Sequence, residues 1–310
     1  MSHWESMAAL TSLAPGADSA AALILRLGAE SGRLVHVEHI AARTGQRAPW
    51  PDWVPAEVTA RFSGAGVPAP WAHQAVAADL ARSGQNVIIS TPAASGKSLG
   101  YLLPALTAVL EGATALYIAP TRALAADQLR AVRALGIDGV RAAVLDGDTP
   151  AAERDWARAH AAYLLTTPDM LHHMLLPRHA RWNGFFRRLQ YVIVDECHGY
   201  RGVFGSHVAH VLRRLRRVAV HHGGAARPTG PVFLLASATI SEPAACALLL
   251  TGQHAEEVTE SAAPRGPGRA SMRPTDSAGR GRTKRAPSSA HFALDAASKI
   301  RRAPGAADRE

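Results

Sequence analysis

Residues 86–101 read NVIISTPAASGKSLGY, a short apolar run followed by a Gly-Lys-Ser turn and the start of a helical pattern. In this context the turn is typical of a phosphate-binding loop, because backbone N–H groups at a helix N-terminus point toward the anion. Lys97 would add a cation for the phosphate oxygens and Ser98 a hydroxyl for Mg²⁺. The match is imperfect, since Thr91 stands where the usual pattern begins with glycine. Taken alone, the tripeptide is also compatible with an ordinary helix start.

Apolar runs and helical patterns alternate from residue 86 onward. The runs lie at 86–90, 115–120, 142–147, 162–168, 191–196 and 232–239, and the helical patterns at 97–111, 122–135, 150–159, 169–176 and 206–220. The runs are apolar throughout, as expected of strands buried on both faces of a parallel sheet. The sequence therefore predicts an α/β fold with a mainly parallel sheet flanked by helices, in which ligands bind at the carboxyl ends of the strands.

Composition divides the chain into three parts. We expect residues 1–54 to form an N-terminal extension, residues 55–252 to form the α/β domain, and residues 253–310 to be a mostly disordered basic tail. The tail is rich in Ala, Arg, Ser, Gly and Pro and poor in large apolar residues, so it cannot bury enough surface to offset its ordering entropy.

Weaker patterns occur in both flanking parts. Residues 17–29 have a helical pattern, residues 33–40 are compatible with a strand, and residues 48–55 read as a Pro- and Trp-rich connector. A short helix around 290–302 is the exception that we expect within the tail.

The net charge of +9 is concentrated in the tail, where residues 261–310 hold eleven Lys or Arg and four Asp or Glu. Overall basicity is therefore poor evidence for a nucleic-acid partner of the folded part. No apolar run approaches the ~18 residues of a membrane span, so we expect a cytoplasmic protein without a membrane partner. Cys197 and Cys246 lack metal-ligand spacing and are expected to be reduced thiols, with no zinc site.

A pair of carboxylates follows another buried strand. In YVIVDECH (191–198), four apolar residues lead into Asp195 and Glu196. Adjacent acids at a buried strand end need a cation, because unpaired charge is costly there. In phosphate-loop nucleotidases the first acid holds the Mg²⁺ shell and the second can polarise the attacking water. Together with the Lys97 turn, the pair disfavours the alternative of a merely solvated strand end.

An ordered series of motifs resembles superfamily 2 helicases of the DEAD/DEAH-box group. The segments are WAHQ (71–74), TPAASGKS (91–98), APTRALAADQ (119–128), DGD (146–148), TTPDML (166–171), DECH (195–198) and SAT (237–239). The helicase form of the loop tolerates a first residue other than glycine and often has proline second. Ala94 stands at a usual glycine, a departure shared by relatives written TASGKS. The resemblance covers roughly residues 33–267 and implies two RecA-like domains, of which this would be the first.

The resemblance implies ATP and Mg²⁺ as cofactors. Gln74 would contact adenine, and the loop residues Thr91, Pro92, Ala93, Ala94, Ser95, Gly96, Lys97 and Ser98 would surround the phosphates. Ser98 and Asp195 would hold the metal, and Glu196 would be the general base, with Lys97 as its catalytic partner. His198, Ser237 and Thr239 would couple the nucleotide state to domain movement; a strand-end histidine satisfied by the backbone is the alternative for His198.

The resemblance also implies a nucleic-acid partner, with single-stranded DNA favoured over RNA. Thr121, Arg122, Thr167 and Asp169 begin helices after strands, where hydroxyls and helix N-termini suit phosphate binding. Both threonines are also good N-caps without any ligand. The Arg- and His-rich segment 207–224 is more typical of a solvated helix face than of a DNA-facing stripe.

Within the superfamily, four segments look most like the large bacterial DNA-repair helicases of the YprA or mitomycin-repair type. They are VEHI (37–40), the TASGKS-like loop, DGDTP (146–150) and the stretch from DECH to residue 217. Those proteins carry a four-cysteine zinc domain, and neither that cluster nor motifs IV, V and VI are found after SAT. We therefore hypothesise a truncated or frame-shifted helicase, with a second RecA-like domain supplied, if at all, by another chain. It would bind ATP·Mg²⁺ weakly, hydrolyse it slowly or not at all, and not unwind duplex.

Two other functions remain open at this point. One is a catalytically silent module that binds nucleic acid or a partner through a single RecA-like domain. The other is a phosphate-loop kinase, which is disfavoured because it leaves PTRAL, TPDM and SAT unexplained.

Overall fold

The computed structural model describes residues 37–38, 42–92, 94–264 and 271–272. The chain divides into two compact units, Gly45–Ala263 and a second unit of Met1–Thr44 with Pro264–Glu310. In the second unit, β1 (Val37–Glu38) pairs antiparallel with β9 (Ser271–Met272). β1 lies inside the predicted strand at 33–40, whereas the predicted helices at 17–29 and 290–302 lie outside the described residues.

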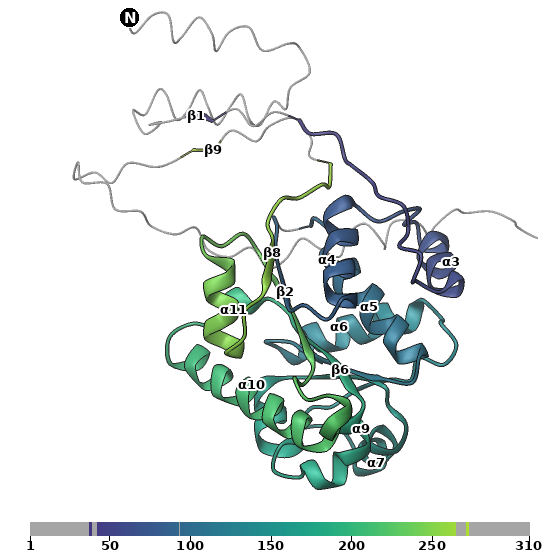
Figure 1. The fold of residues 1–310 in the computed structure, drawn as a ribbon, viewed down its shortest axis with the longest axis vertical. Helices are drawn as coiled ribbons and strands as arrows, with labels where there is room; N and C mark the ends of the chain where they lie inside the picture. Colours follow the sequence, from purple (N-terminus) through teal and green to yellow (C-terminus); the bar gives the residue numbers. More distant parts are fainter. Residues whose placement is uncertain (1–36, 39–41, 93, 265–270, 273–310) are drawn as a thin grey trace, which may run out of the picture. The chain divides into compact units, whose positions relative to one another are not determined.

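The larger unit is built on a seven-stranded sheet in which every pairing is parallel (Figure 1). The strand order is β4-β5-β3-β6-β7-β2-β8. The strands are β2 (Val87–Ser90), β3 (Thr114–Ile118), β4 (Ala142–Val144), β5 (Tyr163–Thr166), β6 (Leu189–Val194), β7 (Val232–Ser237) and β8 (Glu256–Val258). The first six fall on the six predicted apolar runs, and the predicted α/β fold with a parallel sheet is confirmed.

Strand β8 lies beyond residue 252, where the sequence placed the start of a disordered tail. It pairs in parallel with β2 through Val87↔Glu256 and Ile89↔Val258. As an edge strand it buries only Val258, so the segment lacks the apolar run that marks the central strands. The folded unit therefore continues to Ala263, past the boundary expected from composition.

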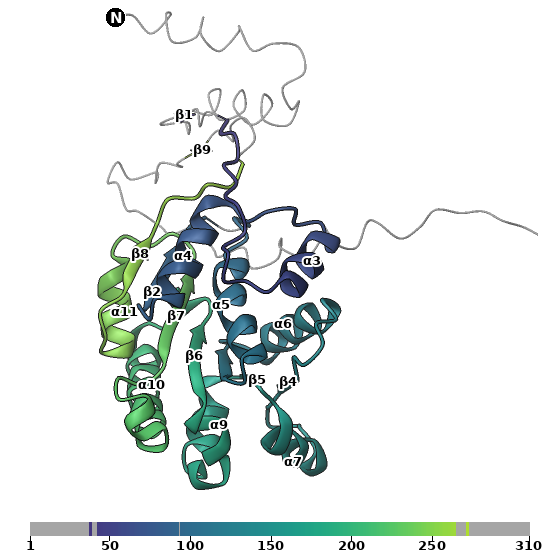
Figure 2. The ribbon, with the colours of Figure 1, turned by 45° about the vertical axis from the view of Figure 1, so that its right-hand side comes forward.

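Helices cover both faces of the sheet. One face packs against α3 (Ala56–Gly64), α4 (Ala72–Arg82), α5 (Ser98–Leu110) and α6 (Arg122–Ala134). The other packs against α7 (Ala151–His160), the π-helical turn η1 (Leu171–Leu175), α9 (Asn183–Arg187), α10 (Gly202–Gly223) and α11 (Pro243–Thr251). Figure 2 shows α10 and α11 on one side of the strands and α5 and α6 on the other.

Several helices differ from the prediction. The pattern at 169–176 folds as a short α8 (Pro168–Met170) that continues into η1. Helix α10 starts four residues earlier than expected, at Gly202, and α3, α4, α9 and α11 were not predicted as helices. Within the described residues, no helix combines the length and the apolar character needed to cross a bilayer.

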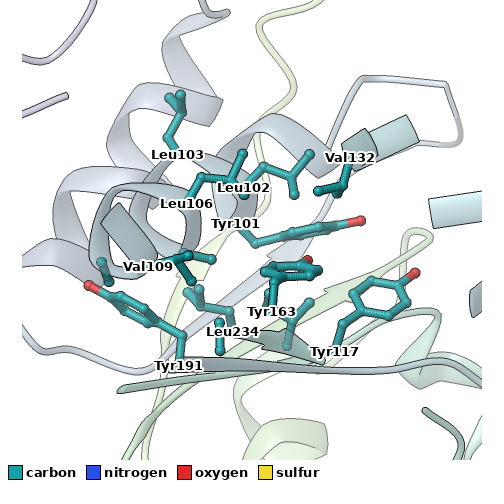
Figure 3. Packing of buried hydrophobic residues seen from close by; sticks show 14 of the residues in the cluster. Tyr101, Leu102, Leu103, Leu106, Val109, Tyr117, Val132, Tyr163, Tyr191 and Leu234 are labelled. Carbon is teal, nitrogen blue, oxygen red and sulfur yellow. The ribbon is translucent and has the colours of Figure 1, made fainter. Parts of the chain in front are cut away.

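A hydrophobic core lies on each face of the sheet. Successive side chains of a central strand point alternately into one core and the other, as the pleat requires. Val87 and Ile89 of β2 face the core under α5, whereas Ile88 faces the core under α10. Tyrosines are the largest fully buried side chains, and Figure 3 shows several of their rings between α5 and the strands. A buried phenol needs a partner for its hydroxyl. The partners of two of these rings lie in the site described below.

The burial of Val258 gives a direct test of β8. Val258 is 7% exposed, whereas the next residue, Thr259, is exposed. Val258→Asp places a charge against the core and should lower the free energy of unfolding by about 3 kcal/mol. Urea unfolding of the full chain measures this loss. Thr259→Asp is the matched control and should change stability by less than about 0.5 kcal/mol. Equal effects of the two substitutions would show that β8 does not form.

Candidate active site

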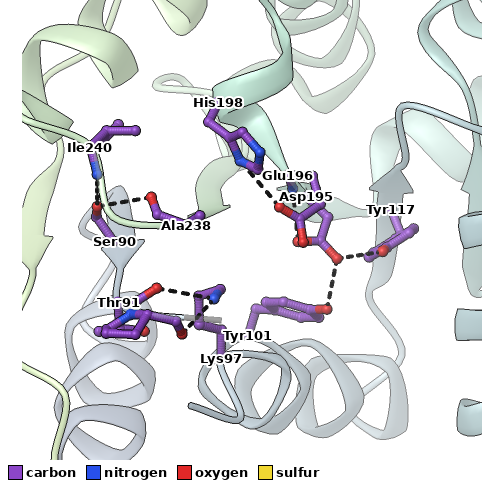
Figure 4. A network of polar contacts seen from close by, with 11 residues as sticks. Ser90, Thr91, Lys97, Tyr101, Tyr117, Asp195, Glu196, His198, Ala238 and Ile240 are labelled. Carbon is purple, nitrogen blue, oxygen red and sulfur yellow. Dashed lines mark hydrogen bonds and ion pairs between the residues drawn. The ribbon is translucent and has the colours of Figure 1, made fainter. Parts of the chain in front are cut away.

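The phosphate-loop candidate and the carboxylate pair meet at one edge of the sheet. β2, which precedes the loop, and β6, which precedes Asp195, are both neighbours of β7. Their registers place Ser90 beside Ser237 and Val194 beside Leu235, so all three strands end close together. Figure 4 shows Lys97, Asp195 and Glu196 in the same region, with the Lys97 amino group bonded to the carbonyls of its own loop. The sheet thus brings together the residues that the sequence assigned to phosphate and metal.

The loop closes on its own lysine. Lys97 Nζ donates to the carbonyl oxygens of Thr91 and Pro92, at 3.1 Å each, and the hydroxyls of Thr91 and Ser95 are 2.7 Å apart. Burial lowers the pKa of Lys97, and the charges of Glu196 and Asp195 oppose that shift. A phosphate could replace the two carbonyls as the partner of this ammonium group. Ala93 lies outside the described residues.

Among the described residues, Lys97 forms no ion pair with either carboxylate. Lys97 is also the only lysine before Lys284, in a chain whose 34 basic residues are otherwise nearly all arginine. A lysine ammonium is a compact point charge, whereas the arginine guanidinium is a broad planar fork. The selective use of lysine here is a signal that the sequence interpretation missed.

Gln74 ties the loop to the start of α4. Its Nε2 donates to the Gly96 carbonyl at 2.7 Å, and its Oε1 accepts from the Trp71 N–H at 2.7 Å. The side chain is 4% exposed. The sequence assigned Gln74 to adenine contact, which stays a prediction; in the structure its side chain is bonded to the loop. A Cβ on Gly96, which has φ +78°, would lie 2.6 Å from this amide nitrogen, so glycine is required there.

Ala94 adopts a left-handed backbone conformation with φ 61°. This is the position where the resembling motif usually has glycine. An alanine pays about 1–2 kcal/mol for that conformation because its Cβ approaches the following carbonyl. The loop therefore keeps the left-handed backbone conformation at this position, although alanine replaces glycine.

Asp195 is held by two tyrosines. Tyr117 on β3 and Tyr101 on α5 both donate to Asp195 Oδ2, at 2.6 and 3.2 Å. The backbone N–H of Glu196 donates to Oδ1 at 2.9 Å. The sequence interpretation missed both tyrosines, although Tyr101 lies one helical turn after Ser98. The Tyr101 hydroxyl contacts Ser98 as well as Asp195, so it links the two expected metal ligands.

The donor set fits a hard divalent cation. Ser98 offers an exposed hydroxyl and Asp195 a carboxylate, the oxygen donors that Mg²⁺ accepts together with phosphates and waters. Glu196 adds a second carboxylate beside them. No donor among these three is a sulfur or imidazole ligand of the kind zinc prefers.

Glu196 lies in a strained and half-buried position. Its φ is 48°, in the left-handed region, and His198 Nδ1 lies 3.1 Å from its Oε2. Burial raises the pKa of Glu196, and Asp195 adds to the rise, whereas His198 and Lys97 oppose it. A carboxylate with a raised pKa beside the phosphate loop is suited to accept a proton.

The SAT loop is bonded to the phosphate-loop strand. Ser90 Oγ donates to the Ala238 carbonyl at 3.3 Å and accepts from the Ile240 N–H at 3.1 Å. Ser237 is buried at the end of β7, and Thr239 is exposed. Because Ser90 directly precedes Thr91, these two bonds connect the start of the phosphate loop to the SAT loop.

The candidate nucleic-acid residues follow the neighbouring strands β3 and β5. Thr121 caps α6 by accepting from the Leu124 N–H at 3.3 Å, and Thr167 caps α8 in the same way from Met170 at 3.5 Å. The capping role left open by the sequence is therefore present for both. Arg122 is exposed and forms an ion pair with Asp148 of the DGD loop, and Asp169 is exposed.

The two hydrogen bonds of the Gln74 side chain predict that removing this side chain destabilises the fold. Gln74→Ala leaves the Gly96 carbonyl and the Trp71 N–H without their side-chain partner, and should lower the free energy of unfolding by about 2 kcal/mol. Denaturant unfolding measures the loss, and hydrogen exchange should be faster at Gly96 and Lys97. Val76→Ala, at an exposed position of the same helix, is the control and should cost less than about 0.5 kcal/mol. A loss no larger than the control's would contradict the link.

The raised pKa of Glu196 predicts that its ionised form lowers the free energy of unfolding, and that this loss depends on pH. The folded state binds this proton more tightly than the unfolded chain, so stability falls as pH rises from the unfolded pKa of about 4.3 through the higher folded pKa. Glu196→Gln should therefore be more stable than wild type at about pH 7.5, and the difference should vanish near pH 4. Thermal unfolding across this range measures it, with the exposed Glu153→Gln as control. A variant less stable than wild type at neutral pH would refute the assignment.

Comparisons with known proteins agree with this geometry. The model of the DEAD/DEAH box helicase family matches residues 71–246. The uncharacterized ATP-dependent helicase YprA of Bacillus subtilis is 38% identical over 239 residues, which are 75% of this chain and 31% of YprA.

Solved structures give the same result. The DUF1998 helicase MrfA bound to DNA superposes with TM-score 0.73 at 37% identity, covering 81% of this chain and 33% of MrfA. MrfA bound to DNA and AMPPNP gives 0.71 at 36%, covering 78% and 35%. The Mycobacterium smegmatis helicase Lhr bound to ssDNA and AMP-PNP gives 0.58 at 28%, covering 69% and 28%.

The chain spans about a third of the length of the YprA and MrfA proteins that it matches. The parallel sheet flanked by helices is a RecA-like domain. Because the family model matches more than half of its residues, the chain belongs to the DEAD/DEAH box helicase family.

Proposed function

We propose that this chain is the ATP-binding part of an ATP-dependent helicase that acts on DNA. The observation that carries the proposal is the meeting of Lys97, Asp195 and Glu196 at one sheet edge, with no ion pair between Lys97 and either carboxylate in the described part of the chain. A site of this kind is suited to an anion and a cation bound together. MrfA and Lhr, which have been solved with DNA and with ATP analogues, support the choice of ligands.

Each residue near the phosphates has a role that follows from its contacts. Lys97 would exchange the Thr91 and Pro92 carbonyls for phosphate oxygens, while Gln74 holds Gly96 in place. Ser98 and Asp195 would hold Mg²⁺, and Tyr101 and Tyr117 fix the Asp195 carboxylate. Bound Mg²⁺ would neutralise charge on the β- and γ-phosphate oxygens.

Glu196 would act on the attacking water. Its carboxylate can accept the water proton as the bond to the γ-phosphate forms, and its raised pKa strengthens it as a base. His198 lies close enough to Glu196 to respond when that charge changes. The bonds from Ser90 to Ala238 and Ile240 give a second route from the phosphate loop to the SAT loop.

The nucleic-acid strand would lie over the ends of β3 and β5. These neighbouring strands place the N-termini of α6 and α8 side by side, with Ile118 opposite Thr166. Phosphates of a single strand could bind the exposed Thr121 and Arg122 there, and Arg122 would have to leave Asp148. Thr167 would act chiefly as a cap, since it is 8% exposed.

Hydrolysis by these residues alone should be slow. In such helicases ATP is hydrolysed between two RecA-like domains, and an arginine supplied across the cleft can contribute about 10³–10⁵ in rate. The larger described unit supplies one such domain, Gly45–Ala263. The resemblance to mitomycin-repair helicases supports a role in DNA repair in the cytoplasm. A non-catalytic module that binds nucleic acid or a partner is the second candidate, favoured by the closed loop in which Lys97 donates to its own carbonyls.

Nucleotide binding tests the proposal. The chain should bind a fluorescent ATP analogue with Mg²⁺, and Lys97→Ala should weaken binding at least about tenfold by removing the charge-assisted bonds. Lys97→Arg should also bind more weakly, because the guanidinium is too broad for the place of the ammonium. Arg61→Ala, at an exposed position on α3, is the control and should bind as wild type does. Unchanged binding by Lys97→Ala would exclude the site.

An ATPase assay separates the two candidates. The helicase proposal predicts slow hydrolysis that single-stranded DNA stimulates and that Glu196→Gln abolishes while ATP binding persists. A non-catalytic module would bind DNA or ATP with no hydrolysis sensitive to Glu196.

A further inference from the structure

A pocket of about 580 Å³ lies between the segment after the carboxylate pair and helix α11. Its walls come from η3 (Cys197–Gly199), the first turns of α10, residues 240–242 and α11. Ala209, Leu249 and Leu250 supply apolar surface, while Arg201, His210 and Arg213 supply basic groups. Glu242 is the acidic residue in the same lining. The pocket is therefore suited to a small ligand that carries negative charge.

Both cysteines of the chain line this pocket. Cys197 and Cys246 are 49 positions apart in sequence, yet their thiols are in hydrogen-bond contact. Cys197 is fully buried, and Cys246 is partly exposed toward the pocket. One thiol is thus open to a reagent, and the second lies within reach of the product.

The surroundings favour the thiolate of Cys246. The hydrogen bond from Cys197 lowers the pKa of Cys246 to about 7 against the effect of burial, and the positive charge of Arg201 lowers it further. Low pKa, partial exposure and an adjacent cation are the features of reactive cysteines. The candidate metal ligands take no part in this environment of Cys246.

We propose that Cys246 is a modification site for anionic low-molecular-weight disulfides, and that Cys197 converts the first adduct into a Cys197–Cys246 disulfide. The Cys246 thiolate attacks one sulfur of the reagent, the reagent's S–S bond breaks, and one thiolate leaves. The Cys197 sulfur then attacks the Cys246 sulfur, and the second thiol leaves with the Cys197 proton. The reagent is reduced to two thiols while the two cysteines are oxidised.

The resulting crosslink would join two segments that adjoin the candidate active site. Cys197 directly follows Glu196, and Cys246 lies on the helix that follows the SAT loop. The disulfide would hold these segments together. The thiol chemistry itself does not depend on ATP binding or hydrolysis.

The test compares two disulfides of opposite charge on the native full chain at about pH 7. Oxidised glutathione is the anionic probe and cystamine the cationic one, followed by free-thiol titration and intact mass. Wild type should lose both thiols and acquire the mass of an internal disulfide. Cys197→Ala should stop at the mixed disulfide, and Cys246→Ser should not react while folded.

The rates carry a quantitative expectation. At pH 7 a pKa near 7 raises the thiolate fraction about sixteenfold over an ordinary thiol, while nucleophilicity falls about fivefold. Because Cys197 itself lowers the pKa of Cys246, the first thiol lost in native wild type should react with oxidised glutathione about threefold faster than Cys246 of Cys197→Ala unfolded in urea. Cystamine should lose this advantage, because Arg201 and Arg213 repel it.

Three results would overturn the proposal. They are a slower first reaction of native wild type than of unfolded Cys197→Ala, an equal rate advantage for cystamine, and a wild-type product that stops at the mixed disulfide. Circular dichroism melts of both variants confirm that each is folded before its reactivity is compared.

Discussion

The site depends on one electrostatic constraint: a lysine and two carboxylates share a sheet edge without neutralising one another. Lys97 is bonded to its own loop carbonyls, and Asp195 to two tyrosine hydroxyls and a backbone N–H. Lys97 and Asp195 are thus held by neutral groups, which solvate each charge but leave its field intact, while Glu196 lies beside His198. Direct lysine–carboxylate pairs would remove the place where an anion and a cation bind together.

Holding these groups apart has a local cost. Ala94 and Glu196 both have left-handed backbones, burial lowers the pKa of Lys97, and burial raises that of Glu196. Strain of this kind persists only where the surroundings over-determine it. Here the surroundings are seven parallel strands buried between two helical layers, with Gln74 bonded to the loop from α4. The stability of the sheet compensates for the strain at its edge.

The sequence predicted the central sheet because strands buried on both faces must be apolar throughout, and the six runs obey that rule. The sequence could not predict β8, because this edge strand buries a single valine and its other two residues are glutamates. The Lys97 loop and the acidic pair were predictable because strand ends of one parallel sheet lie together. Tyr101 and Tyr117 were not, because a tyrosine in an apolar segment looks like core until its hydroxyl partner is known. The meeting of Cys197 with Cys246 likewise depends on how α10 packs on α11.

The central claim is that a divalent nucleotide complex binds between the Lys97 loop and the Asp195–Glu196 pair. Paramagnetic broadening by Mn²⁺ with ATP, observed on backbone amide resonances of the full chain, tests it most directly. The account predicts that Gly96, Ser98, Asp195 and Glu196 broaden together, and that Mn²⁺ without ATP has a much weaker effect. Broadening confined to the carboxylate pair, or centred elsewhere on the domain, would contradict it.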